Sequence, residues 1–211
     1  MQPELRLIED YLTDKGALDL PPRPRMIFVV RGYVSIAGRA VGSGETWQGE
    51  GPLLAQAGAA GATLWRWELS AEPALARQMI GVSSRLKLAA ALDLPAGELL
   101  WRGDSVAFPP GGCALLHRHQ GPGIRCTIEG ELRVDTKGES HSYGVGGAWF
   151  EAGPDPVFAQ AGDMPTRFIR VMILPRTLIG KSSIMYVNEE DKAKPKSQQY
   201  KVFVDTPLTR P

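Results

Sequence analysis

The feature that most restricts the fold of this chain is an internal repeat. Residues 27–69 and 126–174 contain the same features in the same order. Each segment opens with a short apolar stretch that ends at a glycine, and continues with residues that alternate in polarity. Each then reaches a tryptophan, Trp47 or Trp149, followed by an Ala-Gln-Ala-Gly segment and a stretch that contains an arginine. We interpret the two segments as a duplication, in which two modules are built alike.

Each module has the pattern of antiparallel β structure. Its short stretches are rich in β-branched and aromatic residues that alternate with polar ones, and turns with glycine or proline separate them. Short strands of this kind expose hydrogen-bonding edges unless their sheet closes on itself. The sequence therefore predicts an all-β chain with two small antiparallel jelly-roll barrels and short helices.

The two modules predict a division of the chain into four parts. The second module has an additional strand pair before the repeated part, and the first module lacks it. The first module is therefore truncated and needs another segment to close it. The predicted parts are a truncated module at 1–70, a linker with a helix and a strand at 71–97, a complete module at 98–188, and a polar linker with a final strand at 189–211.

Segments outside the repeat are candidates for closing the first barrel. We expect a short helix at Glu4–Leu12, and a helix capped by Ser70 that begins residues 71–92 and is followed by a strand. The tail at 200–208 has the pattern of a late strand. We expect this tail to pack back on the first module or to exchange with a second copy, which would make a homodimer. The alternative is a disordered, lysine-rich tail.

Composition argues against several classes of partner. The chain has 24 Lys and Arg against 23 Asp and Glu, a formal net charge of +1, which gives no electrostatic reason to bind nucleic acid or an anionic membrane. Charged residues near the N-terminus exclude the apolar core of a signal peptide, and the apolar runs are too short to span a bilayer. Two cysteines, Cys113 and Cys126, are too few for a disulfide scaffold. We therefore expect a cytoplasmic protein with reduced thiols.

The candidate chemistry lies in the second module, which holds all three histidines of the chain. His117 and His119 are two residues apart, so on a strand they point to the same side. Two imidazoles on one face are a natural beginning for a site that binds one divalent metal ion, such as Fe, Mn, Ni or Zn. His141 lies in a turn-like segment, where we expect it to face solvent.

The segment GGCALLHRHQGPGIRCTIEGELRV resembles the first sequence motif of the cupin superfamily, with Gly111, His117, His119 and Gly130 in register. The segment YGVGGAWFEAGPDPVFAQAG resembles the second cupin motif, with Gly146 at its turn. The resemblance covers residues 98–175, with 26–69 as a weaker copy. It implies a double cupin with a degenerate first barrel. In cupins, the metal ion is held by two histidines and a glutamate of the first motif and a histidine of the second.

The chain departs from this pattern at two of the four ligand positions. The glutamate position falls on Gly123, and the histidine position of the second motif falls near Val157. A metal ion on His117 and His119 would then be completed by water, substrate or an unusual carboxylate. Glu151 is the nearest acidic candidate for a third ligand, and the alternative is an exposed charge at the end of a strand.

Arg125 points to a different ligand. If Gly123 faces the barrel interior, alternation places Arg125 and Thr127 there too, and a buried guanidinium needs an anionic partner. It would also repel a divalent ion about 5 Å away by roughly 6–7 kcal/mol at an effective dielectric of about 20. The carboxylate of a small organic acid, lying between a metal ion and Arg125, would resolve this conflict. In the alternative register, Arg125 faces solvent.

These residues leave three functions open. The first is a metal-dependent enzyme of the oxygenase, isomerase or lyase type that acts on a small organic acid, with Arg125 and Thr127 as substrate-binding residues. The second is a non-catalytic cupin that binds or senses an anionic metabolite without metal. The third is a structural double cupin with no ligand. The sequence identifies no catalytic acid or base.

Overall fold

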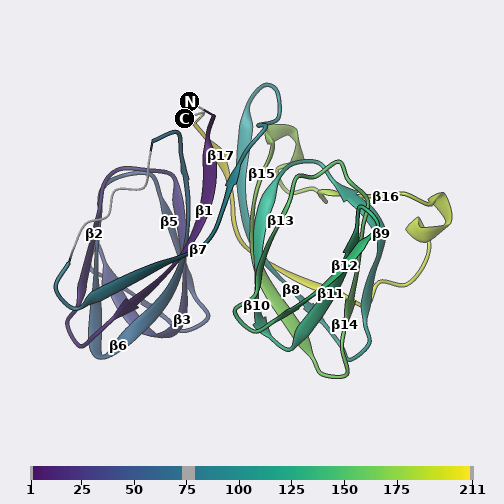
Figure 1. Ribbon diagram of the computed structural model, residues 1–211. Coiled ribbons are helices and arrows are strands. Elements are labelled where there is room, and N and C mark those ends of the chain that lie inside the picture. The colour runs from purple at the N-terminus through teal and green to yellow at the C-terminus, as the bar shows by residue number, and fades with distance from the viewer. Residues whose placement is uncertain (1, 73–78, 210–211) are drawn as a thin grey trace. The chain divides into compact units, whose positions relative to one another are not determined.

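The computed structural model describes residues 2–72 and 79–209, and the chain divides into two compact units, residues 1–91 and 92–210. The regular structure of both units is antiparallel β, as the sequence predicts (Figure 1). Helical structure in the described residues consists of two 3-10 turns, η1 (Arg176–Leu178) and η2 (Glu189–Lys192). Within these same ranges no helix has the length and apolar character needed to cross a membrane.

Unit 1 is built on one seven-stranded sheet. Its path runs β4-β3-β6-β1-β7, with β2 paired to β6 and β5 paired to β3. The apolar faces of these strands enclose a core of leucine, isoleucine, valine and alanine side chains. The strands are β1 (Glu4–Leu12), β2 (Ala17–Leu20), β3 (Arg25–Ile36), β4 (Arg39–Gly42), β5 (Thr46–Gly49), β6 (Leu53–Ser70) and β7 (Val82–Ala91).

The two long strands of unit 1, β3 and β6, change direction at facing glycines. Gly32 has φ of 79° and Gly61 has φ of 70°, in the region that favours glycine. A Cβ atom on Gly32 would lie 2.2 Å from the carbonyl oxygen of Gly61. Because neither strand tolerates a side chain there, the sheet bends at this point and curves around its core.

The predicted helix at Glu4–Leu12 is wrong, because this segment is strand β1, which pairs with both β6 and β7. Two charged residues of this strand, Arg6 and Asp10, lie inside the unit. Both are buried, and the Asp10 carboxylate pairs with Arg66. The strand predicted within residues 71–92 is confirmed as β7. Ser70 is the last residue of β6, and its hydroxyl accepts a hydrogen bond from the backbone N–H of Glu72 at 3.0 Å. The helix predicted after Ser70 falls on residues 73–78, which lie outside the described residues.

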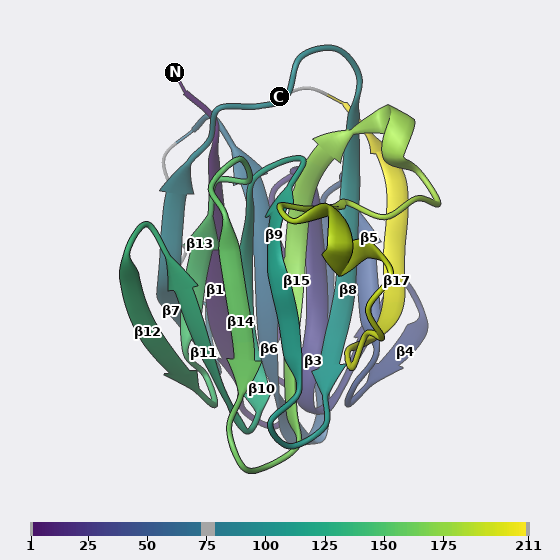
Figure 2. The same ribbon diagram turned by 90° about the vertical axis from the view of Figure 1, so that its right-hand side faces the viewer.

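Unit 2 is a sandwich of two five-stranded sheets, β13-β10-β15-β8-β17 and β12-β11-β14-β9-β16. Figure 2 shows β12, β11, β14 and β9 of the second sheet side by side. The core contains Val106, Phe108 and Phe168 from the first sheet and Leu132 and Val157 from the second. The strands are β8 (Leu99–Phe108), β9 (Cys113–His119), β10 (Gly123–Glu129), β11 (Glu131–Thr136), β12 (Glu139–Gly144), β13 (Ala148–Glu151), β14 (Val157–Ala161), β15 (Thr166–Pro175), β16 (Ile184–Tyr186) and β17 (Gln199–Leu208).

The C-terminal tail forms strand β17, and it completes unit 2. It pairs with β8 from Gln199 opposite Ala107 to Leu208 opposite Leu99. The expectation that the tail packs back on the first module is therefore wrong for this chain. Without β17, β8 would be an unpaired edge of its sheet, whereas in unit 1 the corresponding cover is β7 on β1. Exchange of the tail between two copies in a homodimer stays a prediction.

The repeat seen in the sequence reappears as a common strand register. In each unit, one residue of a central strand pairs with a tryptophan on one side and with an arginine on the other. These triplets are Trp47, Ile27 and Arg66 in unit 1 and Trp149, Arg125 and Arg170 in unit 2. In both units, a tryptophan and an arginine therefore flank the same position of the central strand.

We predict that a chain ending at residue 194 has an unstable second unit, because β8 loses its only neighbour on that side within the described sheet. Calorimetry should show a lower melting temperature for unit 2, and light scattering should show aggregation through the exposed edge. A chain ending at residue 208 keeps the whole of β17 and is the control. Equal melting of the shorter chain and the full chain would contradict this role of the tail.

Candidate functional site

The two histidines of β9 face one another at the centre of unit 2. His117 and His119 are both 4% exposed, and their Nε2 atoms lie 3.2 Å apart. The ring planes are nearly perpendicular, at 84°. Alternation along the strand places both side chains on the same side, as the sequence predicts.

The hydrogen bonds of the pair fix its proton positions. Nδ1 of His117 lies 2.7 Å from the carbonyl oxygen of Leu115, so Nδ1 carries the proton and Nε2 presents a lone pair. The Nε2–H of His119 can then donate to this lone pair. Nδ1 of His119 becomes a buried acceptor, and it has no hydrogen-bond partner among the residues that the structure describes.

Burial keeps both histidines neutral. It lowers the pKa of His117, an effect that the hydrogen bond to Leu115 and the charge of Glu151 partly oppose. It also lowers the pKa of His119 well below its ordinary value, and the positive charges of Arg125 and Arg170 add to this effect. Neutral imidazoles are the form that accepts a proton or binds a metal ion.

Arg125 on β10 is fully buried, so the register in which it faces the interior is the observed one. Its Nη1 donates to the carbonyl oxygen of Gly123 at 2.6 Å. Its Nη2 lies 2.8 Å from Oε2 of Glu151 in an ion pair, but without hydrogen-bond geometry, and its Nε has no hydrogen-bond partner either. Burial lowers the pKa of Arg125 to about 10, and the charge of Glu151 limits the decrease. The guanidinium is still protonated at neutral pH.

Glu151 supplies the carboxylate that the motif position at Gly123 lacks. The two residues are register partners on β13 and β10. A Cβ atom on Gly123 would lie 2.4 Å from the carbonyl oxygen of Val171, so the position has no room for a side chain. The Glu151 side chain is 9% exposed, which excludes the alternative of an exposed charge at the end of a strand. Its Oε2 lies 3.3 Å from Nε2 of His119.

A second buried ion pair, which the sequence analysis did not identify, lies beside this centre. Arg170 on β15 donates twice to Asp104 on β8, at 2.6 and 3.0 Å. The two residues are register partners. The sequence feature that could have identified this pair is the arginine in the last stretch of each copy of the repeat, since Arg66 and Arg170 occupy equivalent positions.

These side chains surround an enclosed cavity, which we call the inner cavity. Its volume is about 20 Å³, which is room for about one water molecule. Apolar side chains of the core form the rest of its wall. The polar residues that line it are His117, His119, Arg125, Glu151, Arg170 and Tyr200.

Thr127 and His141 lie away from this cavity. Thr127 is buried on β10, but its hydroxyl donates to the carbonyl oxygen of Tyr143 at 3.0 Å, and it does not line the inner cavity. The predicted substrate contact through Thr127 is therefore wrong for this arrangement, because the backbone already uses the hydroxyl. His141 is exposed and pairs with Glu139, as expected of a surface residue.

The histidine pair meets part of what a divalent metal ion requires. Two nitrogens that bind one ion at about 2.1 Å lie about 3.0–3.4 Å apart at the usual angles, and the observed separation is 3.2 Å. A metal ion on both nitrogens would replace this hydrogen bond and would move the proton of His119 from Nε2 to Nδ1. The hydrogen bond from His117 to a carbonyl is of the kind that orients metal-binding histidines. However, the described residues contain no group of three His, Cys, Asp or Glu side chains that could hold a metal ion. Glu151, the predicted third ligand, is held by Arg125 and by the indole N–H of Trp149.

We predict that unit 2 loses stability in acid when metal has been removed with a chelator. Both histidine pKa values are lower in the folded state, so below about pH 6.5 the unfolded chain takes up protons first. The free energy of unfolding should then fall by roughly 1 kcal/mol per pH unit for each histidine involved. Urea unfolding at pH 7.5, 6.5 and 5.5 measures this slope.

His119→Gln should flatten this pH dependence, since it removes one of the two groups, and His141→Gln is the control on the exposed surface. A slope that is the same in wild type and in His119→Gln would show that the buried pair does not cause it.

The chain resembles known proteins in its fold, but its sequence has little similarity to theirs. No protein-family model matches the chain, and no curated protein matches it. Among solved structures, two mutants of oxalate decarboxylase from Bacillus subtilis match with a TM-score of 0.63 at 14% and 15% identity, over 91% of this chain and 73% of theirs. A cupin 2 conserved barrel domain protein from Leptotrichia buccalis matches with a TM-score of 0.51 at 11% identity, over 82% of this chain and 84% of that one.

These structures share antiparallel barrel architecture with the present chain, and the chain has the cupin fold. At identities of 11–15%, the likeness extends to the fold alone. The function has to be argued from the residues of the site.

Proposed function

We propose that unit 2 binds a small organic acid, whose carboxylate is held by Arg125 beside the histidine pair. The observation that carries the proposal is the incomplete hydrogen bonding of the guanidinium. Nε and Nη2 form the edge that donates two parallel hydrogen bonds to a carboxylate. Among the described residues Nε has no hydrogen-bond partner, and Nη2 is near Glu151 in an ion pair that lacks hydrogen-bond geometry. A buried donor without a partner costs about 1–3 kcal/mol, which a bound carboxylate would recover.

The surroundings of this edge also favour an acid. His119 Nδ1 and Glu151 Oε2 are buried without hydrogen-bond partners near the same cavity, so polar atoms without partners gather here. Buried polar groups in native proteins are normally hydrogen-bonded, to protein, to water or to a ligand. A ligand that both donates and accepts hydrogen bonds, such as a hydroxy acid or a protonated acid, would match these buried donors and acceptors.

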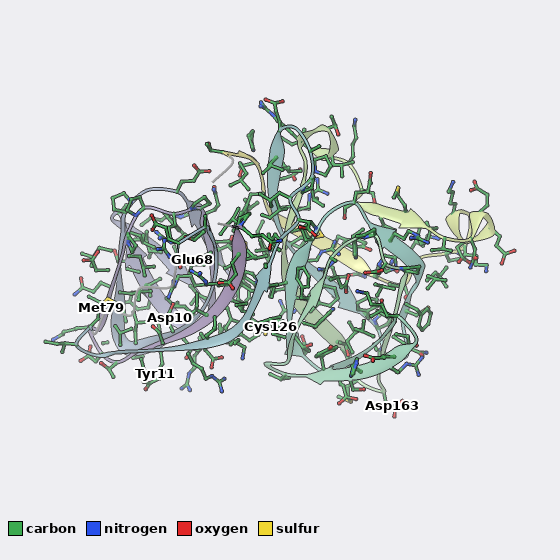
Figure 3. The ribbon with its side chains drawn as sticks, turned by 45° about the horizontal axis from the view of Figure 1, so that its top comes forward. Asp10, Tyr11, Glu68, Met79, Cys126 and Asp163 are labelled. Atoms are coloured by element: carbon green, nitrogen blue, oxygen red, sulfur yellow. The ribbon has the colours of Figure 1, made fainter. Side chains whose placement is uncertain are left out.

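We also infer that the chain is a double cupin, in which unit 1 is a degenerate barrel without a ligand. In unit 1, Arg25 pairs with Glu68 at 2.9 Å, and Arg66 pairs with Asp10 at 2.7 Å and with Glu68 at 2.7 Å. Figure 3 labels the two carboxylates of this network, Asp10 and Glu68, among the strands of unit 1. Arg25, Arg66, Asp10 and Glu68 therefore satisfy one another in this network, whereas in unit 2 the Nε of Arg125 has no hydrogen-bond partner among the described residues.

We predict that small carboxylic acids stabilise unit 2 in a thermal-shift assay, and that the shift depends on Arg125. A ligand at 100 times its dissociation constant adds about 2.7 kcal/mol of stability. Combining Arg125→Met with Glu151→Gln removes both charges together, so that no unpaired buried charge remains, and should abolish the shift. Arg133→Gln, at an exposed position of β11, is the control.

If no acid shifts the melting temperature of the wild type, or if the double variant keeps the full shift, the acid-binding proposal is wrong.

A second candidate function is a metal-dependent enzyme acting on the same acid. The observation that favours it is the distance of 3.2 Å between the two Nε2 atoms, together with the proton position of His117. Fe, Mn, Ni or Zn on the histidines would supply a Lewis acid, and Glu151 or the acid itself would complete the ligands.

We predict that, if this second function holds, protein grown with added Fe, Mn, Ni and Zn contains about one equivalent of metal, and that His117→Ala loses it. Elemental analysis of the purified protein measures the content, with His141→Ala as the matched control. Wild type that stays free of metal would leave the metal-free binding protein as the function.

A further inference from the structure

A larger cavity in unit 2, which we call the outer cavity, adjoins the inner one. Its volume is about 340 Å³, in the range of small-molecule sites. Its walls come from β8, from β17 and from the loop at residues 180–184, which leads into β16. Figure 2 shows the yellow β17 beside β8. The C-terminal segment therefore builds one side of this cavity.

The two cavities share a wall of three side chains. Arg170, Ile184 and Tyr200 line both of them. Ile184 and Tyr200 belong to β16 and β17, the edge strands of their sheets, and Tyr200 is 45% exposed. Side chains on an edge strand can change rotamer without breaking the sheet. An inner cavity of about 20 Å³ has no room for the carbon skeleton of an acid, so the skeleton has to extend past this wall.

One basic residue that lines the outer cavity has no acidic partner among the described residues. Arg102 pairs with Asp205 at 2.8 Å, and Arg170 pairs with Asp104 at 2.6 Å, so these four charges cancel. Lys181 also lines the cavity, and its ammonium group takes part in no ion pair within the described residues. Lys181 is exposed, and the residues that line the outer cavity carry a net charge of +1.

We propose that the ligand of unit 2 is an organic acid with two anionic groups, of which Arg125 holds the first and Lys181 the second. The inference rests on the proposed function, because it needs the first carboxylate at Arg125. The skeleton between the groups passes the side chains of Ile184 and Tyr200 into the outer cavity. Lys181 thus determines specificity for a dianion over a monoanion.

Calorimetric titration with unbranched monocarboxylates and α,ω-dicarboxylates of two to eight carbons tests the proposal. Above a minimum length that reaches Lys181, the dicarboxylate should bind about three to ten times more tightly than the monocarboxylate of equal length, as expected for a partly solvated ion pair. Lys181→Gln should remove this advantage and leave monocarboxylate affinity unchanged. Lys201→Gln, on an exposed position of β17, is the matched control.

The outcomes separate the two proposals. Monocarboxylates and dicarboxylates that bind equally, or an advantage that survives in Lys181→Gln, would overturn the role of Lys181 and leave the site at Arg125 standing. If Lys201→Gln removes the affinity advantage of dicarboxylates to the same extent, the advantage comes from the overall charge of the protein, and the role of Lys181 is wrong. If no acid of either series binds, both proposals are wrong.

Discussion

The burial of the Arg125 guanidinium is the constraint around which unit 2 is organised. A charge removed from water is tolerated only where other charges and dipoles compensate it. Here the compensation comes from Glu151 on a neighbouring strand and from the carbonyl oxygen of Gly123. It is incomplete, because one edge of the guanidinium lacks hydrogen bonds. The incomplete compensation costs stability, and the anion proposed to bind at Arg125 would recover it.

Unit 1 shows the same fold position without this constraint. Ile27 occupies the place of Arg125, and the guanidinium of Arg66 lies where Arg170 lies in unit 2. Arg66 is held by Asp10 and Glu68, and Asp10 also accepts a hydrogen bond from Ser84 of β7. At this position unit 1 therefore has an aliphatic residue and a paired arginine, where unit 2 has two buried arginines.

The C-terminal segment connects stability with ligand selection in unit 2. Strand β17 covers the edge of β8, and β16 pairs with β9 directly opposite His117 and His119. The same segment contributes Ile184, Tyr200 and Lys181 to the cavity walls. Residues that close the fold therefore also line the two cavities, and under the proposal made above they set the space and the charge that a ligand would meet.

The sequence by itself determined the strand-rich fold and the placement of His117 and His119 on the same side of a strand, because alternation and turns are local properties of the chain. It left two registers open for Arg125, and the structure decided for the one in which Arg125 is buried. Only the tertiary structure decided that Glu151 stands opposite Gly123, that Asp104 pairs with Arg170, and that Glu4–Leu12 is a strand. It also decided that the tail joins β8 and that the hydroxyl of Thr127 is used by the backbone. These outcomes depend on the register between strands far apart in the chain, and register is set by packing and charge pairing across the sheet, which no local pattern records.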